Sequence, residues 1–309
     1  MNPRREAWEL LGGEYDVRVL EPSPPAVTTG PWFADDPLAG PYGVRLVTPL
    51  AGLGRSWDDL SRERPELAGF CGDRWLGAWR RLAPLPRAFV ATRRSLHALA
   101  EHVVAAARYA ANGEIGLRFT RHGFGTPYFG AGRQVRVESG RLIVDGASRT
   151  PATLGEAASI VGVPLGMPPD VYIPATPAAP DTHLPLNPAA AEALGAWFGF
   201  AWSVLEQLRF DGRPLSPGRV QLWPEHFDCA VELGEEAAGR RAAFGASPGD
   251  DAHPEPYLYV APWQKRPGAF WTDETFGGAV LSYAALLGAD DQRAAALAFF
   301  RRGLEELNS

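Results

Sequence analysis

Hydrophobic positions with helical spacing run through three long stretches of the chain. The first is TRRSLHALAEHVVAAARYAANG, where Thr92 is the expected N-cap and Gly113 the C-terminal stop. The second, AAAEALGAWFGFAWSVLEQLRF, follows Asn187 and Pro188, which suit the N-cap and the first turn of a helix. The third, DDQRAAALAFFRRGLEELN, has Asp290 as its expected cap. A shorter helix is predicted at LGEAASIVG.

Between these helices apolar and polar residues alternate, a spacing typical of strands. RQVRVESGRLIVD predicts a hairpin with a two-residue turn at Ser139 and Gly140, and a further strand is predicted just before it at EIGLRFT. In this hairpin Glu138 is expected to pair with Arg141. One face then collects the apolar side chains of Val135, Val137, Leu142 and Val144.

A second hairpin joins LWPEHFDCAVEL to RRAAFGA through a polar loop. The odd positions of its first strand are apolar, whereas the even positions are polar or small. We expect a register that sets apolar against apolar residues and opposite charges together. The expected pairs are Leu233–Arg240, Val231–Ala242, Cys229–Phe244, Phe227–Ala246, Glu232–Arg241, Ala230–Ala243 and Asp228–Gly245. The small residues would leave room above the polar face.

Long helices combined with antiparallel hairpins predict an α+β fold, with antiparallel sheets that carry the helices on one face. We expect an irregular N-terminal segment at 1–86, a first α+β half at 87–163, a proline-rich crossover at 164–187 and a second α+β half at 188–309. In the N-terminal segment a strand is expected at VRLVTPL and a helix at GDRWLGAWRRL. Because both halves run helix, strands, helix, they are predicted to be pseudo-repeats.

Composition narrows the class of protein. The chain of 309 residues is 46% hydrophobic and 21% charged, which suits a globular protein with a sizeable core. Its net charge of −6 argues against nucleic-acid binding, which favours a basic surface. No membrane-spanning run or signal peptide is recognised, so no membrane partner is expected. With only Cys71 and Cys229, we expect no disulfide framework, inert thiols and a cytoplasmic location; the oligomeric state stays open.

The polar face of the second hairpin carries the candidate chemistry. His226, oriented by Asp228 or Glu255, is a predicted catalytic base, because imidazole titrates near neutral pH. The expected ligand-binding residues around it are Tyr257, Tyr259, Ser247, Asp250 and, if the halves are repeats, His122. In the structural alternative, His226 only caps the strand end by bonding to a backbone carbonyl.

A divalent metal such as zinc or iron is a further candidate, with His226, Asp228 and His253 as ligands. Their spacing matches no established metal motif. His97 and His102 are five residues apart on the first helix, a spacing that does not bring two side chains together. We therefore expect these two histidines to be ordinary surface or packing residues.

Two short motifs point to chemistry that their context disfavours. HGFGTPYFG lacks the third glycine and the following helix of a dinucleotide-binding fingerprint, so no nucleotide is expected. GASPG matches the nucleophile elbow, but Pro248 has no N–H to donate to an oxyanion. Ser247 is therefore not expected to be a nucleophile.

Four stretches of the sequence are distinctive: RFTRHGFGTPYFGAGRQVRVESGRLIVD, LWPEHFDCAVELG, RAAFGASPGDDAHPEPYLYVAPW and FWTDETFGGAVLSYAALL. They resemble a family of actinobacterial proteins described only as a domain of unknown function, over about residues 85–302. The resemblance implies a cytoplasmic bacterial protein and transfers no catalytic residue. Two functions stay open: an enzyme acting on a small molecule, with or without metal, and a non-catalytic module that binds a ligand or a protein through its tyrosine-lined face.

Overall fold

The computed structural model describes residues 81–309, except for residues 121, 127–128, 130–132 and 212–219. Three expectations fall outside these residues: the strand predicted at 44–50, nearly all of the helix predicted at 72–82, and the state of Cys71.

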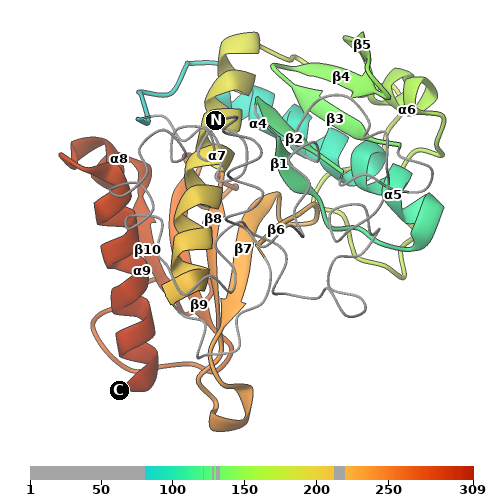
Figure 1. The fold of residues 1–309 in the computed structure, drawn as a ribbon. Helices are drawn as coiled ribbons and strands as arrows, with labels where there is room; N and C mark the ends of the chain where they lie inside the picture. The colour runs from blue at the N-terminus through green and yellow to red at the C-terminus, as the bar shows by residue number, and fades with distance from the viewer. Residues whose placement is uncertain (1–80, 121, 127–128, 130–132, 212–219) are drawn as a thin grey trace, which may run out of the picture.

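Two five-stranded antiparallel sheets frame the protein (Figure 1). Each sheet is a meander, in which every strand pairs with the next one along the chain. The first contains β1 (Arg118–Thr120), β2 (Gly123–Gly125), β3 (Val135–Glu138), β4 (Arg141–Val144) and β5 (Ala147–Arg149). The second contains β6 (Gln221–Trp223), β7 (Asp228–Leu233), β8 (Ala242–Ser247), β9 (Tyr257–Pro262) and β10 (Ala279–Ser282). With the helices, they confirm the predicted α+β fold.

A long helical stretch precedes each sheet, and further helices follow it. Around the first sheet these are α4 (Phe89–Leu99), the π-helix η4 (Ala100–Val104), α5 (Ala105–Asn112) and α6 (Leu154–Val161). Around the second they are α7 (Pro188–Asp211), the short 3-10 helix η6 (Glu236–Ala238), α8 (Tyr283–Gly288) and α9 (Gln292–Asn308). The crossover at 164–187 contains neither helix nor strand. That one half repeats the other stays a prediction.

Two of the predicted helix ends are confirmed. The side chain of Asn187 accepts a hydrogen bond from the backbone N–H of Ala190 at 3.0 Å, which caps the start of α7. Gly113 follows α5 in a left-handed conformation with a φ of 79°, a conformation that glycine adopts without steric strain. Local sequence chemistry therefore suffices to place these two ends.

Two of the predicted caps are wrong. Thr92 lies inside α4, which begins at Phe89, and its hydroxyl contacts the backbone of the crossover instead. At the start of α9 the cap is Asp291, one residue after Asp290, and it accepts a hydrogen bond from Ala294 N–H at 2.9 Å. The Thr92 side chain is hydrogen-bonded to the crossover and is not available as a cap. For α9, Asp290 and Asp291 are equally suitable cap residues, and the sequence does not distinguish between them.

The two hairpins differ in how well their register was predicted. Glu138 pairs with Arg141 across the tight turn, as expected. In the second hairpin Leu233 pairs with Ala242 and Glu232 with Ala243, so the expected register is wrong by two residues. Alternation of apolar residues fixes only which face a residue occupies, and a shift of two keeps the faces. The predicted faces are therefore correct although the pairs are not.

The second sheet is covered by helices on one face. Helices α7 and α9 pack against this face, which carries the buried side chains of β7, β8 and β9 (Figure 1). Helix α7 also contacts β1, β2 and α4, so that the buried apolar residues of both sheets form one cluster. The opposite face of the second sheet, which we call the open face, carries the polar residues singled out from the sequence.

Two further expectations concern the membrane and the thiols. Among the described residues, no helix combines the length and the apolar character needed to cross a membrane. Cys229 is a free, buried cysteine on β7. Burial raises the pKa of its thiol, which agrees with the expected inert role.

Candidate functional site

The open face of the second sheet borders a cavity of about 1250 Å³. Strands β6–β9 form its floor, and its walls come from α4, the crossover, the turn between β6 and β7, and the loop between β8 and β9. Six of the nine predicted site residues line it: His226, Asp228, Ser247, Asp250, Tyr257 and Tyr259. The structure therefore brings most of the predicted site together.

Tyr259 covers part of the floor. It pairs across the sheet with Gly245, and a Cβ built on Gly245 would overlap the tyrosine ring. The absence of a side chain there lets the ring lie over β8, so that the Tyr259 hydroxyl donates a hydrogen bond to Oδ2 of Asp228 on β7. The small residues Ala230 and Ala243 border the cavity itself. Part of the room predicted above the small residues is thus filled by Tyr259.

Asp228 is the buried polar group of this floor, with only 4% of its surface exposed. Burial raises its pKa to about 6, and the charge of Glu225 acts in the same direction, whereas the Tyr259 hydrogen bond and His226 lower it. Its second oxygen, Oδ1, is buried and has no hydrogen-bond partner in the described part of the chain. This carboxyl group can therefore accept a hydrogen bond from a ligand and exchange a proton near neutral pH.

The turn between β6 and β7 spans residues 224–227 and carries His226 at the cavity. Phe227 has a φ of 54°, an unusual value for a side chain of its size, and its ring is buried. His226 is exposed. Of the two carboxylate oxygens of Asp228, Oδ2 accepts the Tyr259 hydroxyl and Oδ1 has no partner among the described residues. Neither oxygen is hydrogen-bonded to His226. The expected orientation of His226 by Asp228 is therefore not seen.

The loop between β8 and β9 is organised by Asp250. Its Oδ1 accepts the backbone N–H groups of Ala252 and His253, each at 2.7 Å, and its Oδ2 accepts the hydroxyl of Tyr257 at 2.6 Å. The Ser247 hydroxyl accepts a backbone N–H from the same loop at 3.1 Å. Asp250 thus shapes the cavity wall, with both carboxylate oxygens already used by the protein.

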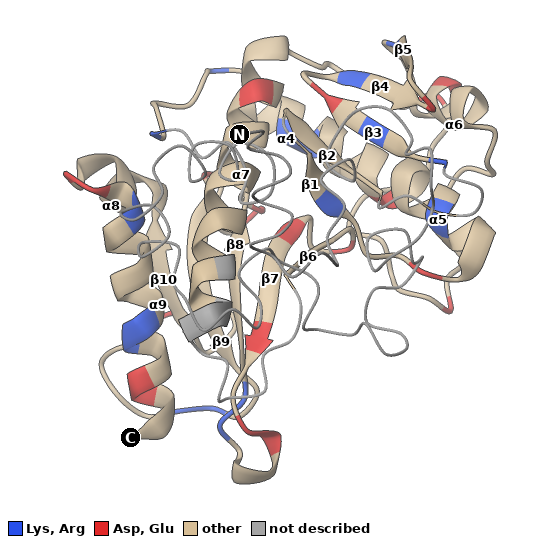
Figure 2. Cartoon of the chain, viewed as in Figure 1, with Lys and Arg blue, Asp and Glu red and all other residues tan. Residues whose placement is uncertain are grey.

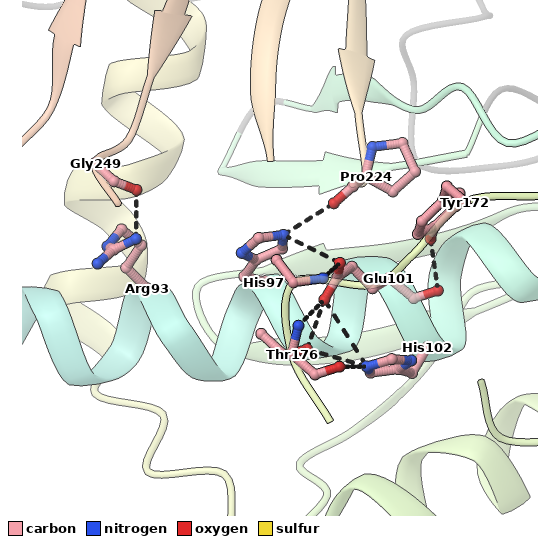
Figure 3. A network of polar contacts seen from close by, with 9 residues as sticks. Arg93, His97, Glu101, His102, Tyr172, Thr176, Pro224 and Gly249 are labelled. Carbon is pink, nitrogen blue, oxygen red and sulfur yellow. Dashed lines mark hydrogen bonds and ion pairs between the residues drawn. The ribbon is translucent and has the colours of Figure 1, made fainter. Parts of the chain in front are cut away.

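Helix α4 binds the β8–β9 loop and the β6–β7 turn, two walls of the cavity (Figure 3). The Arg93 guanidinium donates one hydrogen bond to the backbone carbonyl of Gly249 and one to that of Asp250, both in the β8–β9 loop. His97 Nε2–H donates to the carbonyl of Pro224 at 3.0 Å, and its ring stacks on Phe227 at 5.1 Å between centroids. Burial lowers the pKa of His97 to about 4, so the ring is neutral at physiological pH. The turn that carries His226 is therefore fixed to α4.

The π-helix η4 places Glu101 and His102 in a buried network with the crossover (Figure 3). The Glu101 carboxylate accepts the N–H of Ala175 at 2.6 Å and, from Thr176, the N–H at 3.0 Å and the hydroxyl at 2.5 Å. His102 Nε2–H donates to the Thr176 carbonyl at 2.7 Å. Burial raises the pKa of Glu101 and lowers that of His102.

Both helix histidines are buried packing residues, one of the two roles expected of them, and both also lie close to Glu101. Nε2 of His97 lies 3.6 Å and Nε2 of His102 lies 3.8 Å from the Glu101 carboxylate. His97 precedes Glu101 by four residues, a spacing that makes side chains neighbours on a helix, and His102 directly follows Glu101 where the helix changes from α to π. The sequence alone does not reveal this change of helix type.

Three of the predicted site residues lie outside the cavity lining. Glu255 is exposed. His253 faces Asp273, with 3.2 Å between Nε2 and a carboxylate oxygen. His122 Nδ1 lies 3.1 Å from a carboxylate oxygen of Glu192 on α7, near the first sheet. The predicted repeat had suggested that His122 joins the site, but His122 lies outside it.

The predicted metal set of His226, Asp228 and His253 is not assembled. Within the part of the chain that the structure describes, no three His, Cys, Asp or Glu side chains are grouped as metal ligands. The reason is local, because His253 pairs with Asp273 and not with the two residues of the hairpin.

Sequence reasoning missed several lining residues. Trp223 and Glu225 stand beside His226 in WPEHFD, and their proximity to it was a usable signal. Arg93 and His97 were detectable as polar residues spaced by four in a helix rich in alanine. The contribution of the crossover at 175–177 depends on tertiary packing and leaves no local signal.

Comparisons with family models, curated proteins and solved structures found no significant similarity to this chain. The resemblance to the actinobacterial family therefore stays a prediction, and the function has to be inferred from the geometry of the cavity.

Proposed function

We propose that this protein binds a small organic molecule in the cavity on the open face of the second sheet. The carrying observation is Asp228, whose buried Oδ1 has no hydrogen-bond partner among the described residues, at the floor of a cavity of about 1250 Å³. A buried polar atom without a partner is unfavourable, and a ligand that donates a hydrogen bond removes this penalty. The cavity is large enough for a drug-sized molecule, because such sites measure about 300–1,000 Å³.

A second candidate function is acid–base catalysis on the bound molecule, with Asp228 as the group that accepts or donates the proton. Its pKa of about 6 favours this role, because general catalysis works best when the pKa lies near the working pH. Tyr259 would orient the carboxylate through its hydrogen bond. Binding alone requires no turnover, so the two candidates separate in any assay that follows consumption of the bound compound.

Filling the cavity should abolish binding. Ala243 lies on β8 and lines the cavity, so Ala243→Phe is expected to occupy ligand space. The measurement is a screen of small organic compounds for those that raise the melting temperature of the wild-type protein, repeated on the variant. The matched control is Ala147→Phe, at an exposed position on β5 of the first sheet. A compound that stabilises wild type should lose its effect only in Ala243→Phe. The proposal is wrong if no compound stabilises wild type, or if Ala243→Phe keeps the effect.

A further inference from the structure

Carboxylates dominate the charge of the cavity. Five acidic side chains line it (Glu225, Asp228, Glu232, Asp250 and Asp251), against two arginines, Arg93 and Arg94. Figure 2 shows acidic positions near both ends of β7, the strand at the centre of the floor. This excess of negative charge favours a positively charged ligand, provided that some of the carboxylates are not already neutralised by the protein.

Three of the five carboxylates have partners within the protein. Asp251 pairs with Arg94 at 2.8 Å. The oxygens of Glu232 accept Arg241 Nε at 3.0 Å and Trp263 Nε1 at 3.1 Å. Asp250, as described above, uses both of its oxygens to organise the β8–β9 loop.

Glu225 and Asp228 are different. Glu225 Oε2 and Asp228 Oδ1 are both buried and have no hydrogen-bond partner among the described residues. The two residues are three positions apart in the β6–β7 hairpin and both line the cavity, and the charge of Glu225 raises the pKa of Asp228. Two neighbouring carboxylates repel each other, and a cation that donates hydrogen bonds to both would reduce the repulsion and pair their buried oxygens.

Aromatic rings lie beside this pair of carboxylates. Trp223 pairs with Asp228 across the β6–β7 ladder. Tyr259 and Phe276 line the same cavity, with their ring centroids 5.9 Å apart. Aromatic faces attract organic cations and pack against apolar groups. A bare metal ion would not need these rings, and within the described residues no metal-binding group is present.

Building on the small-molecule binding proposed above, we propose that the ligand is an organic cation, a protonated amine on an aromatic or apolar body, with its ammonium group held by Glu225 and Asp228. The ammonium group donates the hydrogen bonds that both carboxylates lack. The aromatic or apolar body of the ligand packs against the aromatic side chains of the cavity. Glu225 and Asp228 are then binding residues, whereas Glu232, which is already paired, lines the cavity without contacting the cation.

Three indole compounds of similar size and different charge test this proposal by calorimetric titration of the full chain at neutral pH. They are tryptamine, a cation; tryptophan, a zwitterion; and indole-3-propionate, an anion. Tryptamine should bind the wild-type protein at least about tenfold more tightly than indole-3-propionate, with tryptophan in between. This comparison needs no variant and does not depend on whether a mutant folds.

Variants then locate the ammonium group. Glu225→Gln and Asp228→Asn should each weaken tryptamine binding about 10- to 100-fold, because each removes a charge-assisted hydrogen bond. Glu236→Gln is the matched control, because Glu236 is exposed on η6 outside the cavity lining, and it should leave the affinity unchanged. Equal binding of the anion and the cation, or unchanged affinity in both variants, overturns the cation proposal but leaves small-molecule binding standing. If none of the three compounds binds, the cation proposal also fails, and the cavity-filling screen decides separately whether small-molecule binding fails with it.

Discussion

Asp228 is a buried acidic residue that borders the cavity. Its carboxyl group is placed by the β7 backbone and by the Tyr259 hydroxyl, and that hydroxyl reaches it only because residue 245 has no side chain. The protein therefore holds an acidic group at the cavity floor in a setting that disfavours its charge. A group of this kind is more typical of a binding or catalytic site than of a stabilising contact.

The free energy of unfolding should depend on pH because the Asp228 carboxyl group is buried. Burial raises the pKa of Asp228 from its ordinary value of 3.8 to about 6, so between these values the native state binds the proton more tightly than the unfolded state. The free energy of unfolding then falls as the pH rises through this window. Asp228→Asn keeps an oxygen for Tyr259 and removes the titration. Relative to this variant, the wild type should lose about 2 kcal/mol between about pH 4.5 and about pH 7.5.

Urea unfolding of both proteins at the two pH values checks this. The difference between the proteins is the quantity to follow, because every other titrating group is common to both. A difference that does not change with pH would mean that Asp228 titrates alike in the folded and the unfolded chain.

At the scale of elements, one helical face organises the cavity. Arg93, His97 and Glu101 are spaced by four along α4 and η4, and each binds the backbone of a different wall: the β8–β9 loop, the β6–β7 turn and the crossover (Figure 3). All three residues are buried, with at most 9% of their surface exposed. Their contacts to backbone groups fix the walls without depending on which side chains the walls carry.

Glu101→Ala should release the crossover. It removes the acceptor of the part-buried hydrogen bonds from the N–H groups of Ala175 and Thr176, and hydrogen bonds to a charged group contribute about 1.5–3 kcal/mol each. We expect a loss of about 3 kcal/mol in the free energy of unfolding and faster amide exchange at residues 175–177. Glu101→Gln, which keeps one acceptor oxygen, should fall in between.

The control is Glu305→Ala, the same substitution at an exposed position on α9, which should change neither quantity. Amide exchange at 175–177 that stays at the wild-type rate in Glu101→Ala would show that other contacts hold the crossover in place.

The limits of sequence reasoning follow from the same elements. The tight turn at Ser139–Gly140 fixes the register of its hairpin, and that register was predicted correctly. The β7–β8 loop is longer and contains η6, so alternation could fix the faces but not the pairs. The open face, with Asp228 and Tyr259, was predictable for this reason. The walls supplied by α4 and the crossover were not, because they depend on a π-helix and on contacts between residues far apart in the sequence.

At the scale of the whole molecule, Phe227 joins the two sheets through shared packing. Its ring contacts His97 on α4, Phe124 on β2 and Phe198 on α7, with centroid distances of 5.1, 5.0 and 5.3 Å. Phe227 belongs to the turn that carries His226, so the candidate site lies where the two sheets meet helices α4 and α7. The cavity should therefore be sensitive to the packing between the sheets as well as to its own lining.

Phe227→Ala tests this coupling. Removing a buried phenylalanine costs about 3–5 kcal/mol, and the lost contacts belong to both sheets. Amide-exchange protection should therefore fall together in β2 and β7, as expected when the sheets unfold as one cooperative unit. The comparison is Phe299→Ala on α9, whose ring packs with Phe270 and Phe300 on the second-sheet side. This variant should lose less stability, because the Phe299 side chain is only partly buried. If Phe227→Ala lowers protection in β7 and leaves β2 unchanged, the sheets are separate units, and the cavity is a property of the second sheet and its walls alone.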